Sequence, residues 1–166
     1  PDVVSNDQMG YIFEELIRRF SELSNETAGE HFTPREVISL MVNLLFNPEE
    51  DINRLCADGA MASLYDPGVG TGGMLSTAAQ HVNDLNESAR LEVYGQELNP
   101  QTYAVAKSDI MIKGERQERI YFGNSLTNDK TAGMRFDYML CNPPFGVNWK
   151  KYADPILDEA EHKGYQ

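Results

Sequence analysis

The spacing of apolar residues divides the chain into two kinds of segment. Apolar positions recur at helical spacing in three stretches, 12–20, 37–45 and 74–85. Short runs with strand character lie at 63–66, 91–97, 119–122 and 136–141. Helices and strands alternate from residue 63 onward. This alternation predicts an α/β fold with right-handed crossovers and a mostly parallel sheet flanked by helices.

Capping residues mark the expected helix boundaries. Thr33 is a suitable N-cap, Pro34 fits the first helical position, and Glu36 would complete a capping box. The pair Asn47–Pro48 ends that helix. The pair Asn99–Pro100 predicts the start of another helix, which we expect to reach about residue 112.

Bulk composition indicates an ordinary globular protein. The chain has 166 residues, of which 41% are hydrophobic and 10% aromatic, enough for one domain with a core. It opens on Pro1 rather than methionine, which suggests a fragment, and no signal peptide or membrane-spanning run is expected. Cys56 and Cys141 are too few for a disulfide framework, and no spacing of ligands predicts a metal site.

The charge narrows the range of functions. Lys and Arg number 14 against 26 Asp and Glu, which gives a formal net charge of −12. Contacts to nucleic-acid phosphates require basic side chains. Therefore either the protein does not bind nucleic acid, or another chain or domain supplies the basic surface.

Unusual residues follow all four predicted strands. They are Asp66 to Gly73, Glu97, Asn124, and Asn142 to Phe145. In parallel α/β sheets, ligands bind at the carboxyl ends of the strands. The coincidence predicts one functional site at that edge of the sheet.

The glycine-rich segment Asp66 to Gly73 has several possible explanations. Glycines let the backbone approach a ligand, but they also make a tight turn between a strand and a helix. A Walker A loop is excluded because no Gly-Lys-Ser/Thr follows, and the dinucleotide pattern is met only loosely by Gly68, Gly70 and Gly73. An acidic residue before the turn suits a cationic ligand better than a pyrophosphate. The amino group and sulfonium of S-adenosylmethionine are cationic.

Glu97 and the segment Asn142-Pro143-Pro144-Phe145 add two further functions to this edge. An acidic side chain at the end of the second strand can accept hydrogen bonds from ribose hydroxyls, although Glu97 could also be a solvated residue at a helix start. Two consecutive prolines fix the backbone and leave its carbonyls free to accept. With the Asn142 amide oxygen and a ring that can stack on a base, they suit an exocyclic purine amino group. A stiff loop with a packed Phe145 is the alternative.

These segments together resemble the methylation subunit of type I restriction–modification systems, in the N6-adenine DNA methyltransferase family. The matching segments occur in the family's order: residues 13–18, 29–34, 66–73, 94–99, 123–126 and 136–146. An Asn-Pro-Pro-Phe motif alone is shared with enzymes that methylate glutamine or RNA. The His-Phe-Thr-Pro segment at 31–34 is what favours the DNA family.

The resemblance implies S-adenosylmethionine as cofactor and a role for each matching residue. Asn142, Pro143, Pro144 and Phe145 would form the catalytic site, where the first two bind the target amino group and Phe145 stacks on the flipped base. No catalytic metal is implied. The cofactor-binding residues would be His31, Phe32, Thr33, Asp66, Gly68, Gly70, Thr71, Gly72, Glu97, Asn124 and Ser125. Val69 departs from the small residue common in the family, which could narrow the cofactor pocket.

The resemblance also implies an architecture and partners. Residues 1–30 would be an N-terminal helix and linker, and residues 31–166 a partial catalytic domain with a Rossmann-like S-adenosylmethionine-dependent methyltransferase fold. About four of seven strands would be present, with the fourth at an open edge. A specificity subunit, a restriction subunit and duplex DNA would be partners in the cytoplasm of a bacterium or archaeon. A glutamine or RNA methyltransferase, or a cofactor-binding scaffold, are the alternatives.

Overall fold

A computed structural model describes residues 33–144 and 148–163, together with Gln8, Met9, Ile12, Glu15, Leu16 and Arg19. These six residues near the start of the chain are helical, in agreement with the helix predicted there. The remainder of the 1–30 segment lies outside the described residues, so its division from the catalytic domain stays a prediction.

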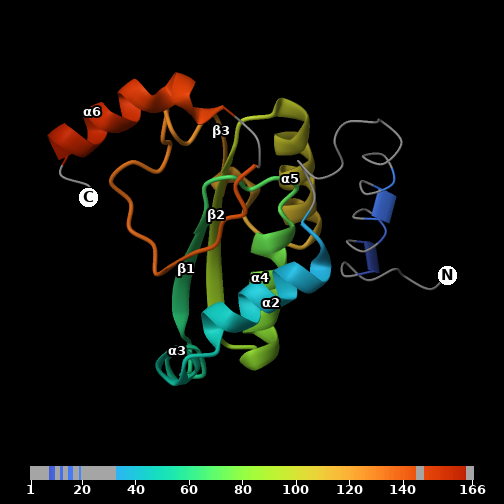
Figure 1. Ribbon diagram of the computed structural model, residues 1–166. Coiled ribbons are helices and arrows are strands. Elements are labelled where there is room, and N and C mark those ends of the chain that lie inside the picture. Colours follow the sequence, from blue (N-terminus) through green and yellow to red (C-terminus); the bar gives the residue numbers. More distant parts are fainter. Residues whose placement is uncertain are drawn as a thin grey trace.

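Strands and helices alternate from residue 61 to residue 122, and the third and fourth strands follow one another without a helix between them (Figure 1). The helices are α2 (Arg35–Phe46), α3 (Glu49–Leu55), α4 (Gly73–Leu85), α5 (Pro100–Ile112) and α6 (Ala153–Lys163), with short 3-10 turns η1 (Gln117–Arg119) and η2 (Trp149–Tyr152). The strands are β1 (Met61–Asp66), β2 (Arg90–Glu97), β3 (Ile120–Phe122) and β4 (Tyr138–Met139).

The four strands form one parallel sheet in the order β3-β2-β1-β4. The chain therefore moves outward from β1 to β3 and then returns past β1 to place β4. This reversal makes the carboxyl end of β1 the point where ligands bind in open α/β sheets. Within the described chain β4 lies at the edge of the sheet, as predicted.

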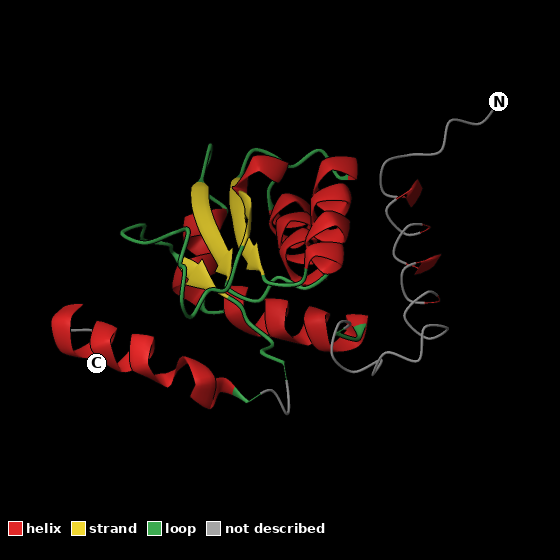
Figure 2. Cartoon of the chain, turned by 90° about the horizontal axis from the view of Figure 1, so that it is seen from above, coloured by secondary structure: helices red, strands yellow, loops and turns green. Residues whose placement is uncertain are grey.

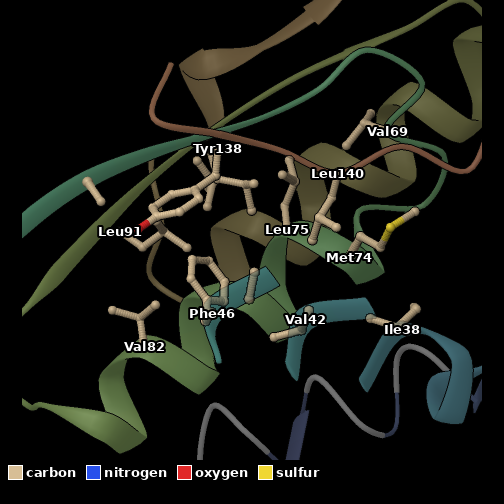
Figure 3. Packing of buried hydrophobic residues seen from close by; sticks show 14 of the residues in the cluster. Ile38, Val42, Phe46, Val69, Met74, Leu75, Val82, Leu91, Tyr138 and Leu140 are labelled. Atoms are coloured by element: carbon tan, nitrogen blue, oxygen red, sulfur yellow. The ribbon is translucent and has the colours of Figure 1, made fainter. Parts of the chain in front are cut away.

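Helices α4 and α5 pack against one face of the sheet, and α2 packs against α4 on the same side (Figures 1 and 2). Figure 3 shows apolar side chains of α2 and α4 meeting those of the strands in one core. Leu75, Val82 and Phe46 are fully buried there, and the Phe46 ring lies edge-on to Tyr138 at a centroid distance of 4.9 Å. Helical spacing in the sequence produces this continuous apolar face, since residues three and four apart lie on one side of a helix.

Aromatic rings instead of aliphatic chains cover the opposite face. Phe136 stacks on Tyr65 at 4.8 Å and lies 5.0 Å from Tyr94. The Arg119 guanidinium lies 4.8 Å from the centre of the Tyr94 ring and pairs with Glu92 at 2.6 Å. The loop between β3 and β4, which carries Phe136, therefore packs onto the sheet on this side.

Three details differ from the sequence predictions. Helix α2 begins at Arg35, with Pro34 as N-cap and no side-chain capping bond, so the capping box predicted for Thr33 and Glu36 is wrong. The strand predicted at 136–141 is reduced to Tyr138–Met139. Helices α3 and α6 were not predicted from the sequence.

The short β4 has a physical reason in the residue before it. The Asp137 carboxylate accepts from the backbone N–H and the hydroxyl of Ser63, both at 2.8 Å, and pairs with Arg54. Arg54 and Ser63 hold the pKa of Asp137 below its usual range. A side chain therefore takes the place of the backbone ladder where the strand was expected to begin.

Candidate active site at the carboxyl edge of the sheet

The segment after β1 folds as a tight turn into α4. Gly70 and Gly72 have φ of 56° and 91°, values that favour glycine over any residue with a Cβ. The N–H of Gly72 donates to Val69 O at 3.0 Å, and that of Val69 donates to Gln96 O at 3.1 Å. The turn is thus fixed both internally and against β2.

Asp66 is enclosed beneath this turn. One carboxylate oxygen accepts from Gly68 N–H at 3.0 Å, and the other is buried without a hydrogen-bond partner among the described residues. Burial, helped by the nearby Glu97 carboxylate and opposed by the Gly68 hydrogen bond, raises the pKa of Asp66 to about 7. An unpaired buried oxygen costs about 1–3 kcal/mol, which a hydrogen-bond donor at the site would offset.

Glu97 connects the turn after β1 to the start of α5. Its Oε2 accepts from Gly70 N–H at 3.0 Å and its Oε1 from Asn99 N–H at 2.7 Å. It therefore ties the turn after β1 to the start of α5, where Asn99 caps the helix as predicted. A carboxylate offers about four acceptor positions, so two remain for ligand hydroxyls.

The turn after β3 joins the same group. The Ser125 hydroxyl donates to the carbonyl of Pro67 in the turn after β1, and Gly123 N–H donates to Glu97 O at 2.9 Å. Asn124 uses its side-chain oxygen locally, accepting from Leu126 N–H at 2.9 Å. The three turns after β1, β2 and β3 therefore form one connected edge.

Asn142, after the fourth strand, lies at the same edge of the sheet. The N–H of Leu140 donates to Tyr65 O at 3.1 Å, which extends the alignment with β1 beyond β4. Asn142 is half-buried, and its amide nitrogen donates to the Thr33 hydroxyl oxygen at 3.0 Å. Pro143 and Pro144 follow and are exposed.

Cys141 lies between the glycine-rich turn after β1 and Asn142. A Cβ placed on Gly68 would be 3.9 Å from the Cys141 sulfur, so the turn after β1 directly adjoins the residue before Asn142. Burial, together with the Asp66 carboxylate, raises the pKa of the Cys141 thiol to about 11. This cysteine is therefore a packing residue at neutral pH rather than a thiolate.

The structure brings together most of the residues that the sequence singled out. Those after all four strands share one edge, and Thr33 joins them from 109 residues away. Thr71 lies half-buried in the turn after β1. His31, Phe32 and Phe145 lie outside the described residues, so their roles stay predictions.

Gln96 is a supporting residue that the sequence analysis missed. Its side chain is fully buried, donates to Asn128 O at 2.8 Å and accepts from Lys130 N–H at 3.0 Å. It thereby holds the loop after β3 against the sheet. A polar residue inside a strand was the available signal, since buried polar groups are kept where they have hydrogen-bond partners.

Val69 occupies a different place from the one that the sequence suggested. Its side chain is buried in the hydrophobic core, where Figure 3 shows it near Leu140 and Met74. A Cβ on Gly95 would lie only 2.8 Å from Val69 Cγ2. Val69 therefore packs inward against β2, which argues against a narrowing of the cofactor pocket.

Within residues 33–144 and 148–163 and the six helical residues near the start, no cluster of three His, Cys, Asp or Glu side chains is arranged to hold a metal ion. No helix among these residues is long and apolar enough to cross a membrane.

A parallel sheet in the order β3-β2-β1-β4, with a glycine turn after β1 and an acidic residue after β2, is the Rossmann-like fold of S-adenosylmethionine-dependent methyltransferases. The chain belongs to the N-6 DNA methylase family, whose model matches residues 4–163.

Two relatives and one solved structure make the likeness specific. The chain is 32% identical over 91% of its length to the type I restriction enzyme MjaIX methylase subunit of Methanocaldococcus jannaschii, covering 26% of that protein. It is 26% identical over 97% of its length to the HindI methylase subunit of Haemophilus influenzae, covering 34% of it. The crystal structure of a type I restriction-modification methyltransferase subunit from Streptococcus thermophilus matches 87% of the chain and 29% of its own, with 30% identity and a TM-score of 0.67.

The chain thus spans about a quarter to a third of the length of the relatives that it matches.

Proposed function

We propose that this chain carries the catalytic site of an enzyme that transfers a methyl group from S-adenosylmethionine to N6 of adenine in duplex DNA. The observation that carries the proposal is that the glycine-rich turn and the Asn142 segment lie next to each other at one edge of the sheet. The turn Asp66–Gly73 adjoins the Asn142 segment through Gly68 and Cys141. Family membership and the likeness to methylase subunits support the same chemistry.

The residues at the edge fit the cofactor chemically. The unpaired oxygen of Asp66 attracts a cationic amino group, and the spare acceptor positions of Glu97 suit ribose hydroxyls. Backbone N–H groups at the start of α4 and the side chains of Thr71, Asn124 and Ser125 complete the cofactor set, with Thr33 and, by resemblance, His31 and Phe32. S-adenosylmethionine supplies an electrophilic methyl group when bound.

Asn142 and Pro143 would act on the target base. The Asn142 amide oxygen and the Pro143 carbonyl accept hydrogen bonds from the two N–H groups of adenine. These bonds draw the amino group toward tetrahedral geometry and expose its lone pair. The prolines keep the acceptors fixed, so catalysis depends on positioning and preorganised dipoles. Phe145 would stack on the base, which must be flipped out of the duplex because N6 is paired inside it.

Transfer of a labelled methyl group by the full-length protein, assayed together with its specificity subunit, tests this proposal. Duplex DNA, RNA and protein acceptors are offered separately, and the nucleosides of the DNA product are identified by mass. We expect N6-methyladenine from DNA and no label in the other two. Label on RNA or on protein glutamine would replace the proposal by its alternatives, and cofactor binding without transfer to any acceptor would indicate a scaffold.

The partners follow from the charge and from the relatives. A net charge of −12 opposes contact with phosphates, so we propose that a separate specificity subunit supplies most of the DNA surface. The protein would work with that subunit and a restriction subunit in a bacterial or archaeal cytoplasm. DNA binding measured with and without the specificity subunit checks this: tight binding by this protein alone would contradict it.

A further inference from the structure

The Thr33 hydroxyl is not used for the local purpose that its position suggests. A threonine directly before a proline and a helix is expected to cap that helix. Here the N-cap is Pro34, and no side chain caps α2. The hydroxyl oxygen instead accepts from the Asn142 amide nitrogen at 3.0 Å.

Both ends of this hydrogen bond are held by the core. Ile38, one turn into α2, is 4% exposed and lies against the start of α4, where a Cβ on Gly73 would be 3.3 Å from its Cδ1. Asn142 follows Leu140, whose side chain is buried and whose N–H bonds to β1. The contact between Thr33 and Asn142 is therefore set by tertiary packing.

The direction of the bond determines what Asn142 offers. An amide has donors on its nitrogen and acceptors only on its oxygen, and the two lie on opposite sides of a planar group. With the nitrogen turned to Thr33, the oxygen is turned away from it. An amide rotated by half a turn would present N–H groups to a target amino group that itself donates, so the target amino group would have no acceptor there.

We propose that Thr33 is a positioning residue for Asn142, which orients the amide so that its oxygen faces the target amino group. The catalytic consequence of this role rests on the proposed function, whereas the hydrogen bond between Thr33 and Asn142 does not depend on it. A hydroxyl can accept one bond and donate another, so this role is compatible with a contact between Thr33 and the cofactor.

Three variants of the full-length protein, assayed with its specificity subunit, test the role. Thr33→Val keeps the branched shape and removes the acceptor, Thr33→Ser keeps the acceptor, and Thr77→Val makes the first change at a half-buried position inside α4. At saturating cofactor and DNA, we expect Thr33→Val to lower kcat by about tenfold to a hundredfold. Thr77→Val keeps kcat within about threefold of the wild type. Thr33→Ser, which retains the hydroxyl, recovers most of the kcat that Thr33→Val loses. Calorimetry gives the cofactor Kd of each variant separately.

A second readout needs neither cofactor nor DNA. Asparagine is labelled with ¹⁵N, and the Asn142 side-chain amide signals are identified by their disappearance in Asn142→Ala. We expect these signals to shift in Thr33→Val and to stay in place in Thr33→Ser and Thr77→Val. An unmoved amide in Thr33→Val overturns the inference, as does a kcat that is unchanged at saturation. If the amide shifts while the wild type fails to methylate DNA, the proposed function is wrong and the orientation of Asn142 by Thr33 stands.

Discussion

The two halves of the candidate site are held in different ways. The cofactor half, Asp66–Gly73 with Glu97, is fixed by its own hydrogen bonds: Asp66 to Gly68, Glu97 to Gly70, and Val69 to β2. The target half, Asn142–Pro144, is stiffened by two prolines, and its one functional amide is oriented by Thr33 from a distant helix start.

This difference predicts which property changes when each half of the site is altered. Rigid turns with many internal bonds tolerate the loss of one remote contact, whereas a side chain with a single long-range partner depends on the packing that brings the partner near. Damage to the target half should therefore change turnover and leave cofactor binding intact. Damage to the cofactor half should change stability and affinity.

The largest expected effect is in the target half. Asn142→Ala removes the amide oxygen and should lower methyl transfer by more than about a hundredfold, because preorganised acceptors supply several kcal/mol of transition-state stabilisation. Cofactor affinity measured by calorimetry should stay within about threefold of the wild type. Asn83→Ala, at an exposed position on α4, is the control. Near wild-type turnover in Asn142→Ala would refute the proposed mechanism.

The pH dependence of stability probes the interior of the cofactor half. The pKa of Asp66 is raised to about 7 in the folded protein, so the folded state holds its proton more tightly than the unfolded state does. Stability should therefore fall as pH rises from about 4 to about 7, by on the order of 2–4 kcal/mol for this group. Asp66→Asn keeps an acceptor for Gly68 and should remove that fall. Urea unfolding of both proteins at pH 5 and pH 8 measures it, and equal pH dependence in both would contradict the raised pKa of the buried Asp66.

The support beneath the turn is tested by glycine substitutions. Gly95→Ala would place a Cβ 2.8 Å from Val69 Cγ2 and 3.1 Å from Leu75 Cδ1, so we expect a loss of about 1–3 kcal/mol in unfolding free energy. Gly68→Ala is the matched change, since its Cβ would meet only Cys141 at an ordinary 3.9 Å. It should cost less than Gly95→Ala in the same unfolding experiment. The reverse order would show that Val69 does not fix the turn against β2.

The smallest expected effect concerns Glu97. Glu97→Ala should weaken S-adenosylmethionine binding by roughly 1–3 kcal/mol, because ligand hydroxyls and the Gly70 N–H lose their acceptor. Glu97→Gln keeps one acceptor oxygen and should lose less. Glu87→Ala, at an exposed site before β2, should bind as the wild type does. Calorimetry that finds the same affinity in all four proteins would remove Glu97 from the site.

Much of the frame could be predicted from the sequence because its signals are local. The positive φ of Gly70 and Gly72, the cap at Asn99 and the end of α2 before Pro48 each follow from residue type at one position. The four clusters of unusual residues after strands were sufficient to predict a shared edge, since parallel strands end on the same side.

The tertiary structure alone decided the partners of particular side chains. Thr33 had two possible uses, and only the packing of Ile38 against the start of α4 determined that it meets Asn142 instead of capping α2. Strand β4 is short because Asp137 binds Ser63, a contact across 74 residues of sequence. Val69 turns into the core because Gly95 leaves room for it on the neighbouring strand. Local propensity and patterning are properties of neighbours in the chain, whereas a long-range hydrogen bond or a steric vacancy exists only after the chain has folded.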